Sequence, residues 1–376
     1  MARLLPGVAV SLVLLSSSIA SAQALVARPF SAAAGEADAG ELLATATAFL
    51  ENRNQQLLRD GRPGATSVVS NLSETMSARA ARDNAALREF RDRLALLGET
   101  YSAAKTGTRL IDTREEDGRT IARVEETSYF EYARVRGDEP TYTAFRVERE
   151  FTFSRHEGGW VLEDVRLLEQ GGLAPLNEVV TEPVSAVGQL LSPPEEAADL
   201  TRPALTPGVQ ESFLKEEAPA ANVASYDYSA MANYAVAWAL GRNPSYRTFP
   251  NDCTNFISQA VTAGGWAQVS GWYQNNDVWW YNSLNQSYTW AGAENWYWFA
   301  TGSGRTYMLA NVWYMGVADV LQMDFENDNN INHTMMVTQI AGSEIYLSYH
   351  TTDTLNRSLS SIIAAYPSAW YYAHRT

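Results

Sequence analysis

Cys253 is the only cysteine of this 376-residue chain, and its thiol is the side chain best suited to nucleophilic chemistry. One cysteine cannot form an internal disulfide, so three interpretations remain: a reactive nucleophile, an intermolecular bridge or a small buried residue. A thiol that attacks a carbonyl needs a base to accept its proton, and histidine is the natural candidate. We interpret Cys253 as the nucleophile.

Four histidines are available as the base. His156 lies beside a turn in the first half of the chain, where we expect a solvated loop, and His374 lies two residues from the end. The remaining two, His333 and His350, are the candidates.

Two elements must bring the thiol and these histidines together. The sequence predicts a helix over Ser229–Leu240 and a second over Cys253–Ala263, closed by Gly264-Gly265. The second helix puts the thiol at its positive end, which favours the thiolate.

An antiparallel hairpin that turns at Gly342-Ser343 would pair His333 with a residue near Thr352. His350 and Asp353 would both end close to His333, and either could orient its imidazole.

Several ordered motifs carry a resemblance to a known family. They are Tyr234-Ala235, Asn243-Pro244-x-Tyr246, Asp252-Cys253-Thr254-Asn255-Phe256, Ser258-Gln259, Gly264-Gly265, Asn332-His333-Thr334 and Tyr349-His350-Thr351. Over about residues 225–376 the chain resembles the bacterial putative amidase domain family, which is similar to papain-like, NlpC-type and CHAP cell-wall peptidases and amidases.

The resemblance implies an α+β, papain-like domain that needs no cofactor. By the family's pattern Cys253 attacks an amide carbonyl, His333 acts as base and then acid, and His350 orients it, with Asp353 as the alternative third residue. Asp252 would hold the loop, and the amides around it would form an oxyanion hole with the Cys253 N–H. The chain has Ala318-Asp319 where relatives usually show Gly-Asp, so the turn there is expected to differ.

The N-terminus has the pattern of an export signal. A short basic start precedes the apolar run Val8–Leu15 and a small-residue cleavage site, all within Met1–Ala24. No segment offers the roughly 20 apolar residues that span a bilayer, so we expect a mature protein outside membranes, secreted or associated with the cell wall. The expected parts are a signal peptide at 1–24, an accessory domain at 25–174, a linker at 175–224 and the amidase-like domain at 225–376.

The accessory domain reads as two helices followed by antiparallel strands. Apolar residues keep helical spacing around Leu42–Leu50 and Leu87–Leu97 and then alternate from Phe145 to Phe153, and Asp117-Gly118 is a hairpin turn. This order resembles the small, cone-shaped α+β folds related to nuclear transport factor 2. Seven of the fourteen prolines fall between Pro175 and Pro219, which is typical of an extended linker.

Composition disfavours several kinds of partner. The net charge is −15, with 43 acidic and 28 basic residues, so nucleic acid and anionic lipid are unfavourable partners. One cysteine rules out a Cys/His zinc set, and the acidic run Asp324–Asn330 lacks the glycine of a calcium loop. We therefore expect no metal.

Seven of the eleven tryptophans lie between Trp266 and Trp298. Most must serve the core of the domain, and a minority would line a cleft for peptide or glycan. The candidates for substrate contact are Tyr246, Trp272 and Trp279.

The leading hypothesis is an exported cysteine amidase or peptidase that cleaves an amide bond, plausibly in peptidoglycan peptides, through a thioacyl-enzyme. The alternative is a non-catalytic cell-wall or glycan binder with a degenerate site. Acyl transfer to an amine is a third hypothesis, and the sequence leaves the oligomeric state open.

Overall fold

A computed structural model describes residues 34–376 except 62–68, 70, 169–170 and 181–225. The predicted signal peptide and most of the predicted linker therefore lie outside the described residues. Within them the protein is a mixed α+β structure built around a large antiparallel sheet. In this part of the chain no helix has the length and apolarity needed to cross a membrane.

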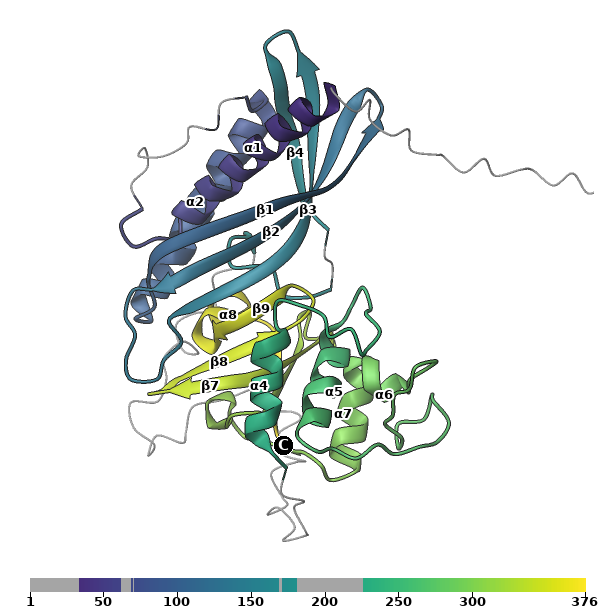
Figure 1. Cartoon of the computed structure of the whole chain (residues 1–376). Helices are drawn as coiled ribbons and strands as arrows, with labels where there is room; N and C mark the ends of the chain where they lie inside the picture. The colour runs from purple at the N-terminus through teal and green to yellow at the C-terminus, as the bar shows by residue number, and fades with distance from the viewer. Residues whose placement is uncertain (1–33, 62–68, 70, 169–170, 181–225) are drawn as a thin grey trace, which may run out of the picture.

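The first half of the chain forms helices followed by antiparallel strands, as the sequence predicts, with two helices and four strands among its described residues. The hairpin at Asp117-Gly118 is confirmed, and both residues have positive φ (51° and 74°), the conformation that such two-residue turns require. The two helices lie together on one side of the strands (Figure 1). The elements are α1 (Ala34–Gln55), α2 (Glu74–Leu96), β1 (Tyr101–Glu116), β2 (Arg119–Tyr132), β3 (Tyr142–His156) and β4 (Gly159–Leu167).

The second half begins with helices and ends in strands. The predicted helix at Cys253–Ala263 is found with those bounds as α5, and α4 occupies Tyr228–Trp238. The other elements are α6 (Tyr288–Ala291), α7 (Ala293–Gly302), β5 (Tyr307–Met308), η2 (Val312–Tyr314), β6 (Val320–Asp324), β7 (His333–Ala341), β8 (Glu344–Tyr349), β9 (Asp353–Ser358), α8 (Leu359–Ala365) and β10 (Trp370–Arg375).

One sheet runs through both halves of the molecule. Its strand order is β1-β2-β3-β9-β8-β7-β6-β10-β5, with β4 paired to β3. The junction is the β3–β9 pairing, in which Ala144, Phe145 and Arg146 lie opposite Leu355, Thr354 and Asp353. The two predicted domains are therefore joined by backbone hydrogen bonds as well as by the chain.

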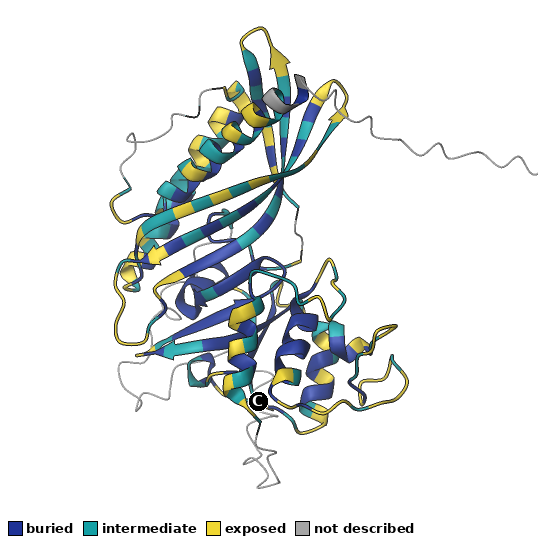
Figure 2. Ribbon diagram, viewed as in Figure 1, coloured by how far each residue is buried: buried dark blue, intermediate teal, exposed yellow. Residues whose placement is uncertain are grey.

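The three largest apolar clusters of the described residues stabilise this arrangement. Figure 2 shows where buried residues lie along the helices and strands. One cluster lies between α1, α2 and the first strands, around Phe49 and Phe151. A second holds α4, α5 and α7 against β6 and β7 and contains Trp279 and Trp290. The third, which we call the junction core, includes Phe130 of the first half and Tyr349 of the second. The sheet thus has different cores on its two faces near β7.

Residues 171–180, which follow β4, are packed rather than extended into solvent. Leu173 and Leu176 belong to the junction core, and Asn177 is fully buried. Arg53 donates to the Asn177 carbonyl oxygen at 2.8 Å. The first residues assigned to the linker from sequence, 175–180, therefore belong to the folded part.

Candidate active site

The thiol of Cys253 lies at the first position of α5 and is nearly buried, with 5% of the residue exposed. Burial raises the pKa of the thiol, and the charge of Asp252 adds to the rise, while hydrogen bonds from Thr254 and the Thr334 backbone oppose it. The helix terminus still directs unpaired N–H groups to this point. Among the described residues, the Cys253 N–H has no acceptor, so it is available to an oxyanion.

Asp252 holds the loop that delivers the thiol. One carboxylate oxygen accepts hydrogen bonds from the Phe249 N–H at 3.1 Å and the Asn255 side chain at 2.8 Å. Its own N–H donates to Thr351 Oγ1 at 2.8 Å. The predicted role in holding the loop fits these contacts, whereas the Asp252 N–H is already used.

His350 lies on the α5 side of the sheet with both ring nitrogens engaged. Nδ1 is 2.8 Å from Asp252 Oδ2, and Nε2 is 2.8 Å from the carbonyl oxygen of Trp238. The ring stacks on Phe256 with centroids 4.0 Å apart. Neither nitrogen points to His333, so in this structure His350 orients the loop around Asp252.

His333 is the first residue of β7 and is fully buried. Its ring lies against Tyr349 and Phe325, at centroid distances of 5.1 and 6.0 Å. Neither ring nitrogen has a hydrogen-bond partner, and burial lowers the pKa of the imidazole to about 3. The ring is therefore neutral at physiological pH and able to accept a proton from a nearby donor.

The two histidines lie on opposite faces of the sheet. Thr334 Oγ1 is 2.9 Å from Thr254 Oγ1 on α5, so the side chain one position earlier, His333, points to the junction core. The Cys253 thiol meets the backbone of Thr334 at the start of β7. The structure thus brings the thiol next to the His333–Thr334 segment, but no hydrogen bond joins the sulfur to the His333 ring.

Asp353, the alternative third residue, forms ion pairs with Arg146 and Arg242, both at 2.7 Å. Arg146 belongs to β3 and lies opposite Asp353 in the register. The carboxylate therefore links the two halves of the molecule and is not directed at His333.

A buried polar chain, which the sequence analysis missed, connects the thiol to His374. Cys253 Sγ is 3.7 Å from Thr254 Oγ1, and Thr334 Oγ1 accepts a hydrogen bond from Gln322 Nε2 at 3.1 Å. Gln322 Oε1 is 3.1 Å from His374 Nε2. No spacing signal could have revealed this chain, because its members come from four separate elements.

The segment after β4 packs beside this region. A Cβ on Gly172 would lie 2.0 Å from the Thr351 carbonyl oxygen, and one on Gly171 would lie 3.4 Å from the Asn251 side chain. The segment therefore packs on the turn at Thr351 and on the loop that precedes Cys253.

The three aromatic candidates for substrate contact have different positions. Trp279 is fully buried among Trp266, Trp290 and Phe299, so this candidate ring belongs to the core in this structure and has no exposed face for a substrate. Trp272 is 62% exposed. Tyr246 is half-buried and packs on Tyr281.

Metal-ligand geometry is not found around the site. Among the described residues, no group of three His, Cys, Asp or Glu side chains could hold a metal ion. The Asp324 carboxylate instead accepts hydrogen bonds from the Asp328 and Asn329 N–H groups of the turn before β7.

Comparison with known proteins identifies the class of the second half. Residues 225–374 match the family described as "Putative amidase domain", so this part of the chain is a domain of that family. Acting on amide bonds is the class of chemistry that the family name denotes.

Two curated relatives are similar over part of their length. "Uncharacterized protein YhbB" of Bacillus subtilis (strain 168) is 34% identical over 30% of this chain and 37% of its own length. "Uncharacterized protein YjcM" of the same organism is 32% identical over 36% of this chain and 34% of its own length. The chain thus spans about a third of each relative.

Two solved structures show weak likeness. The intermembrane space region of chloroplast protein ARC6 is 10% identical, with a TM-score of 0.25 over 35% of this chain and 96% of that one. Kfla4162 protein from Kribbella flavida is 17% identical, with a TM-score of 0.24 over 35% and 90%. Scores this low carry no argument about the fold.

Proposed function

We propose that this protein is an exported cysteine amidase or peptidase, with a papain-like catalytic domain, that cleaves an amide bond through a thioacyl-enzyme. The observation that carries the proposal is the thiol at the N-terminus of α5, beside an unpaired backbone N–H and the segment that bears a neutral histidine. Stem peptides of peptidoglycan are the proposed substrate, because the export pattern directs the protein outside the cytoplasm.

The reaction needs few groups. Cys253 Sγ bonds to the carbonyl carbon while its proton passes to a ring nitrogen of His333, and the carbonyl oxygen accepts a hydrogen bond from the Cys253 N–H. The C–N bond then breaks, and the amine leaves with the proton from His333. Water, deprotonated by His333, attacks the thioester, releases the carboxylic acid and restores the thiol.

This mechanism requires the resting structure to rearrange. The His333 side chain, which points to the junction core on the face of the sheet away from α5, has to reach the sulfur. In the resting structure the Cys253 thiol and the His333 imidazole are both neutral, because burial raises the pKa of the thiol and lowers the pKa of the imidazole.

The test is digestion of purified cell-wall sacculi and synthetic stem peptides, followed by mass analysis of the products. We expect new amine and carboxylate ends with the wild type and none with Cys253→Ala, while His156→Ala, an exposed histidine of the first half, stays active. An acyl adduct on Cys253 would support the intermediate directly. Turnover that survives Cys253→Ala would overturn the proposal.

A second candidate function, glycan binding without catalysis, is favoured by one surface feature. Trp272 and Tyr288 are 62% and 47% exposed, and both rings contact Tyr273, at 4.7 and 5.3 Å. Exposed aromatic rings are suited to stacking on sugars. Retention of sacculi binding by Cys253→Ala, loss of it in Trp272→Ala and no product with the wild type would favour this candidate.

A further inference from the structure

A cavity of about 210 Å³ lies away from Cys253, where loops of the two halves meet. Its walls come from the α2–β1 turn, the β2–β3 loop and the β7–β8 turn, which occupies residues 341–344. The β7–β8 turn is the far end of the strand that begins at His333. The cavity is smaller than pockets for drug-sized ligands, so it suits a smaller molecule.

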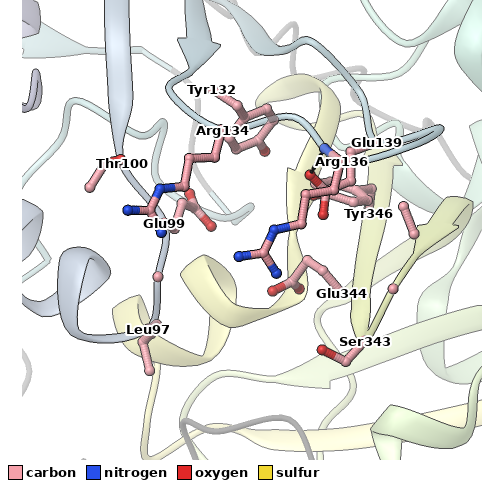
Figure 3. A pocket seen from close by; sticks show the side chains of 13 residues that line it. Leu97, Glu99, Thr100, Tyr132, Arg134, Arg136, Glu139, Ser343, Glu344 and Tyr346 are labelled. Atoms are coloured by element: carbon pink, nitrogen blue, oxygen red, sulfur yellow. Dashed lines mark hydrogen bonds between the residues drawn. The ribbon is translucent and has the colours of Figure 1, made fainter.

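Two carboxylates from opposite walls face this cavity (Figure 3). Glu99 is 9% exposed and accepts hydrogen bonds from the Tyr101 and Ser358 hydroxyls. Glu344 accepts hydrogen bonds from the Ser360 hydroxyl at 2.6 Å and the Ser360 N–H at 3.2 Å. Neither carboxylate has an ion-pair partner within the described ranges, and each still has lone pairs for another donor.

The negative charges of Glu99 and Glu344 favour a cation between them. Burial, together with the charge of Glu99, raises the pKa of Glu344 to about 7, and burial also raises the pKa of Glu99. An ammonium group between the two carboxylates would stabilise their charged forms. Its positive charge offsets the repulsion between them, and its N–H groups replace hydrogen bonds that the buried carboxylates have lost from water.

The mouth of the cavity carries the opposite charge. Arg134 and Arg136 are both exposed, and their guanidinium groups reach toward the cavity from the β2–β3 loop (Figure 3). Neither guanidinium has a hydrogen bond or ion pair to a described residue, although Glu139 lies in the same loop and accepts from the Arg136 N–H. Two unpaired forks of donors are well suited to a carboxylate.

We propose that this cavity binds a small zwitterion, an amino acid or the end of a short peptide. Its ammonium group lies between Glu99 and Glu344, and its carboxylate contacts Arg134 and Arg136. Tyr132 and Tyr346, whose side chains also line the cavity, enclose the carbon skeleton. This site is separate from Cys253, so the inference stands whether or not the thiol is catalytic.

The experiment titrates the whole protein with three molecules of matched size and follows binding by saturation-transfer NMR. Alanine carries both charges, propionate only the carboxylate and ethylamine only the ammonium. We expect alanine to bind at least about tenfold more tightly than either analogue. Equal binding of propionate would indicate a plain anion site, and equal binding of ethylamine a plain cation site. Either result, or no binding of alanine up to about 10 mM, would overturn the proposal.

Variants then assign the two ends of the ligand. Glu344→Gln keeps the hydrogen-bond acceptor for Ser360 and removes the charge, and the double change Arg134→Ala with Arg136→Ala removes the guanidinium groups. Each should weaken alanine binding about tenfold or more, whereas Arg119→Ala, at the exposed end of the β1–β2 hairpin, should not. Unchanged binding in both cavity variants, with thermal unfolding like that of the wild type, would contradict the assignment.

Discussion

Two buried histidines near the β7–β8 hairpin, one on each face of the sheet, differ in the hydrogen-bond partners of their rings. On the α5 side, His350 has a carboxylate, a carbonyl and a stacked ring as partners. On the junction-core side, His333 has aromatic neighbours and no hydrogen bond at all. Both rings are buried to 1% exposure or less, so burial alone does not distinguish them.

This difference suggests different roles: His350 stabilises the loop around Asp252, and His333 is available to accept a proton. Both partners of His350 are acceptors, a carboxylate and a carbonyl oxygen, so its two nitrogens face acceptors and neither is directed at a proton donor such as the thiol. The unpartnered neutral ring of His333 has a lone pair available for a proton. An unsatisfied buried polar group costs stability and is expected where function requires it. On this reasoning His333 is the better candidate for the base and His350 for the support of the Cys253 loop.

The largest effect should follow from removing the proposed base. His333→Gln should lower the rate of amide cleavage by about 10³-fold, because general acid–base catalysis typically contributes 10²–10⁴. The measurement is kcat on the stem peptide that the wild type cleaves. If His333→Gln keeps more than a tenth of the activity, the contrast between the two histidines does not concern catalysis.

Removing the supporting histidine should mainly reduce stability. His350→Leu leaves the buried Asp252 carboxylate with one charged partner, Arg242. We expect a loss of about 3 kcal/mol in the free energy of unfolding, the upper end of the range for leaving a buried hydrogen-bonding group without its partner. Urea denaturation measures it, with Glu116→Gln on the exposed end of β1 as the control. A change below about 1 kcal/mol would show that the Asp252 network does not depend on His350.

The pH dependence of stability tests the surroundings of His333. Its pKa is lowered to about 3 in the folded protein, so between about pH 6.5 and 3 the unfolded chain binds more protons. Stability should therefore fall as the pH drops through that window, by at most about 1.4 kcal/mol per pH unit for this group. His333→Gln should remove the contribution of His333 to this pH dependence. The contribution of His374, whose pKa is also lowered to about 3 by burial, should remain. An unchanged slope in the variant would mean that His333 is solvated.

The smallest effect tests whether residues 171–172, which pack on the Thr351 turn, limit access to the thiol. Gly172→Val cannot keep the close approach to the Thr351 carbonyl oxygen, so the segment has to shift. We expect iodoacetamide to label Cys253 about tenfold faster, equivalent to about 1.4 kcal/mol in the opening equilibrium. Gly107→Val is the matched control, because a Cβ there has only an ordinary contact at 3.7 Å. Equal labelling rates would show that another part of the structure limits access.

Much of the local structure was predictable from sequence. The bounds of α5 followed from Cys253 at a helix start and Gly264-Gly265 at its end, and the β1–β2 turn followed from Asp117-Gly118. The expected hairpin turn at Gly342-Ser343 is also found, with Ala341 opposite Glu344 and Met336 opposite Ser348. These features depend on short-range rules of capping, turn geometry and alternation.

The packing of residues 175–180 and the burial of Trp279 were not predictable in this way. A proline-rich segment has no periodic pattern, and whether it packs depends on partners distant in sequence, such as Arg53 and Arg149, which both donate to Asn177. The sequence likewise indicates that tryptophans are numerous between α5 and α7, but not which of them face the core.

The sequence by itself determined which reactive groups are present. They are one thiol at a helix start, Cys253, one histidine at the start of a strand, His333, and a second histidine after the next strand, His350. The tertiary structure decided which histidine ring has hydrogen-bond partners and which has none. Side chains on a strand alternate between the two faces of the sheet, and only the packing of one face on α5 and of the other on the junction core determines which face offers a partner. It also joined the two halves through β3 and β9, a pairing that rests on backbone hydrogen bonds and leaves no signature in residue type.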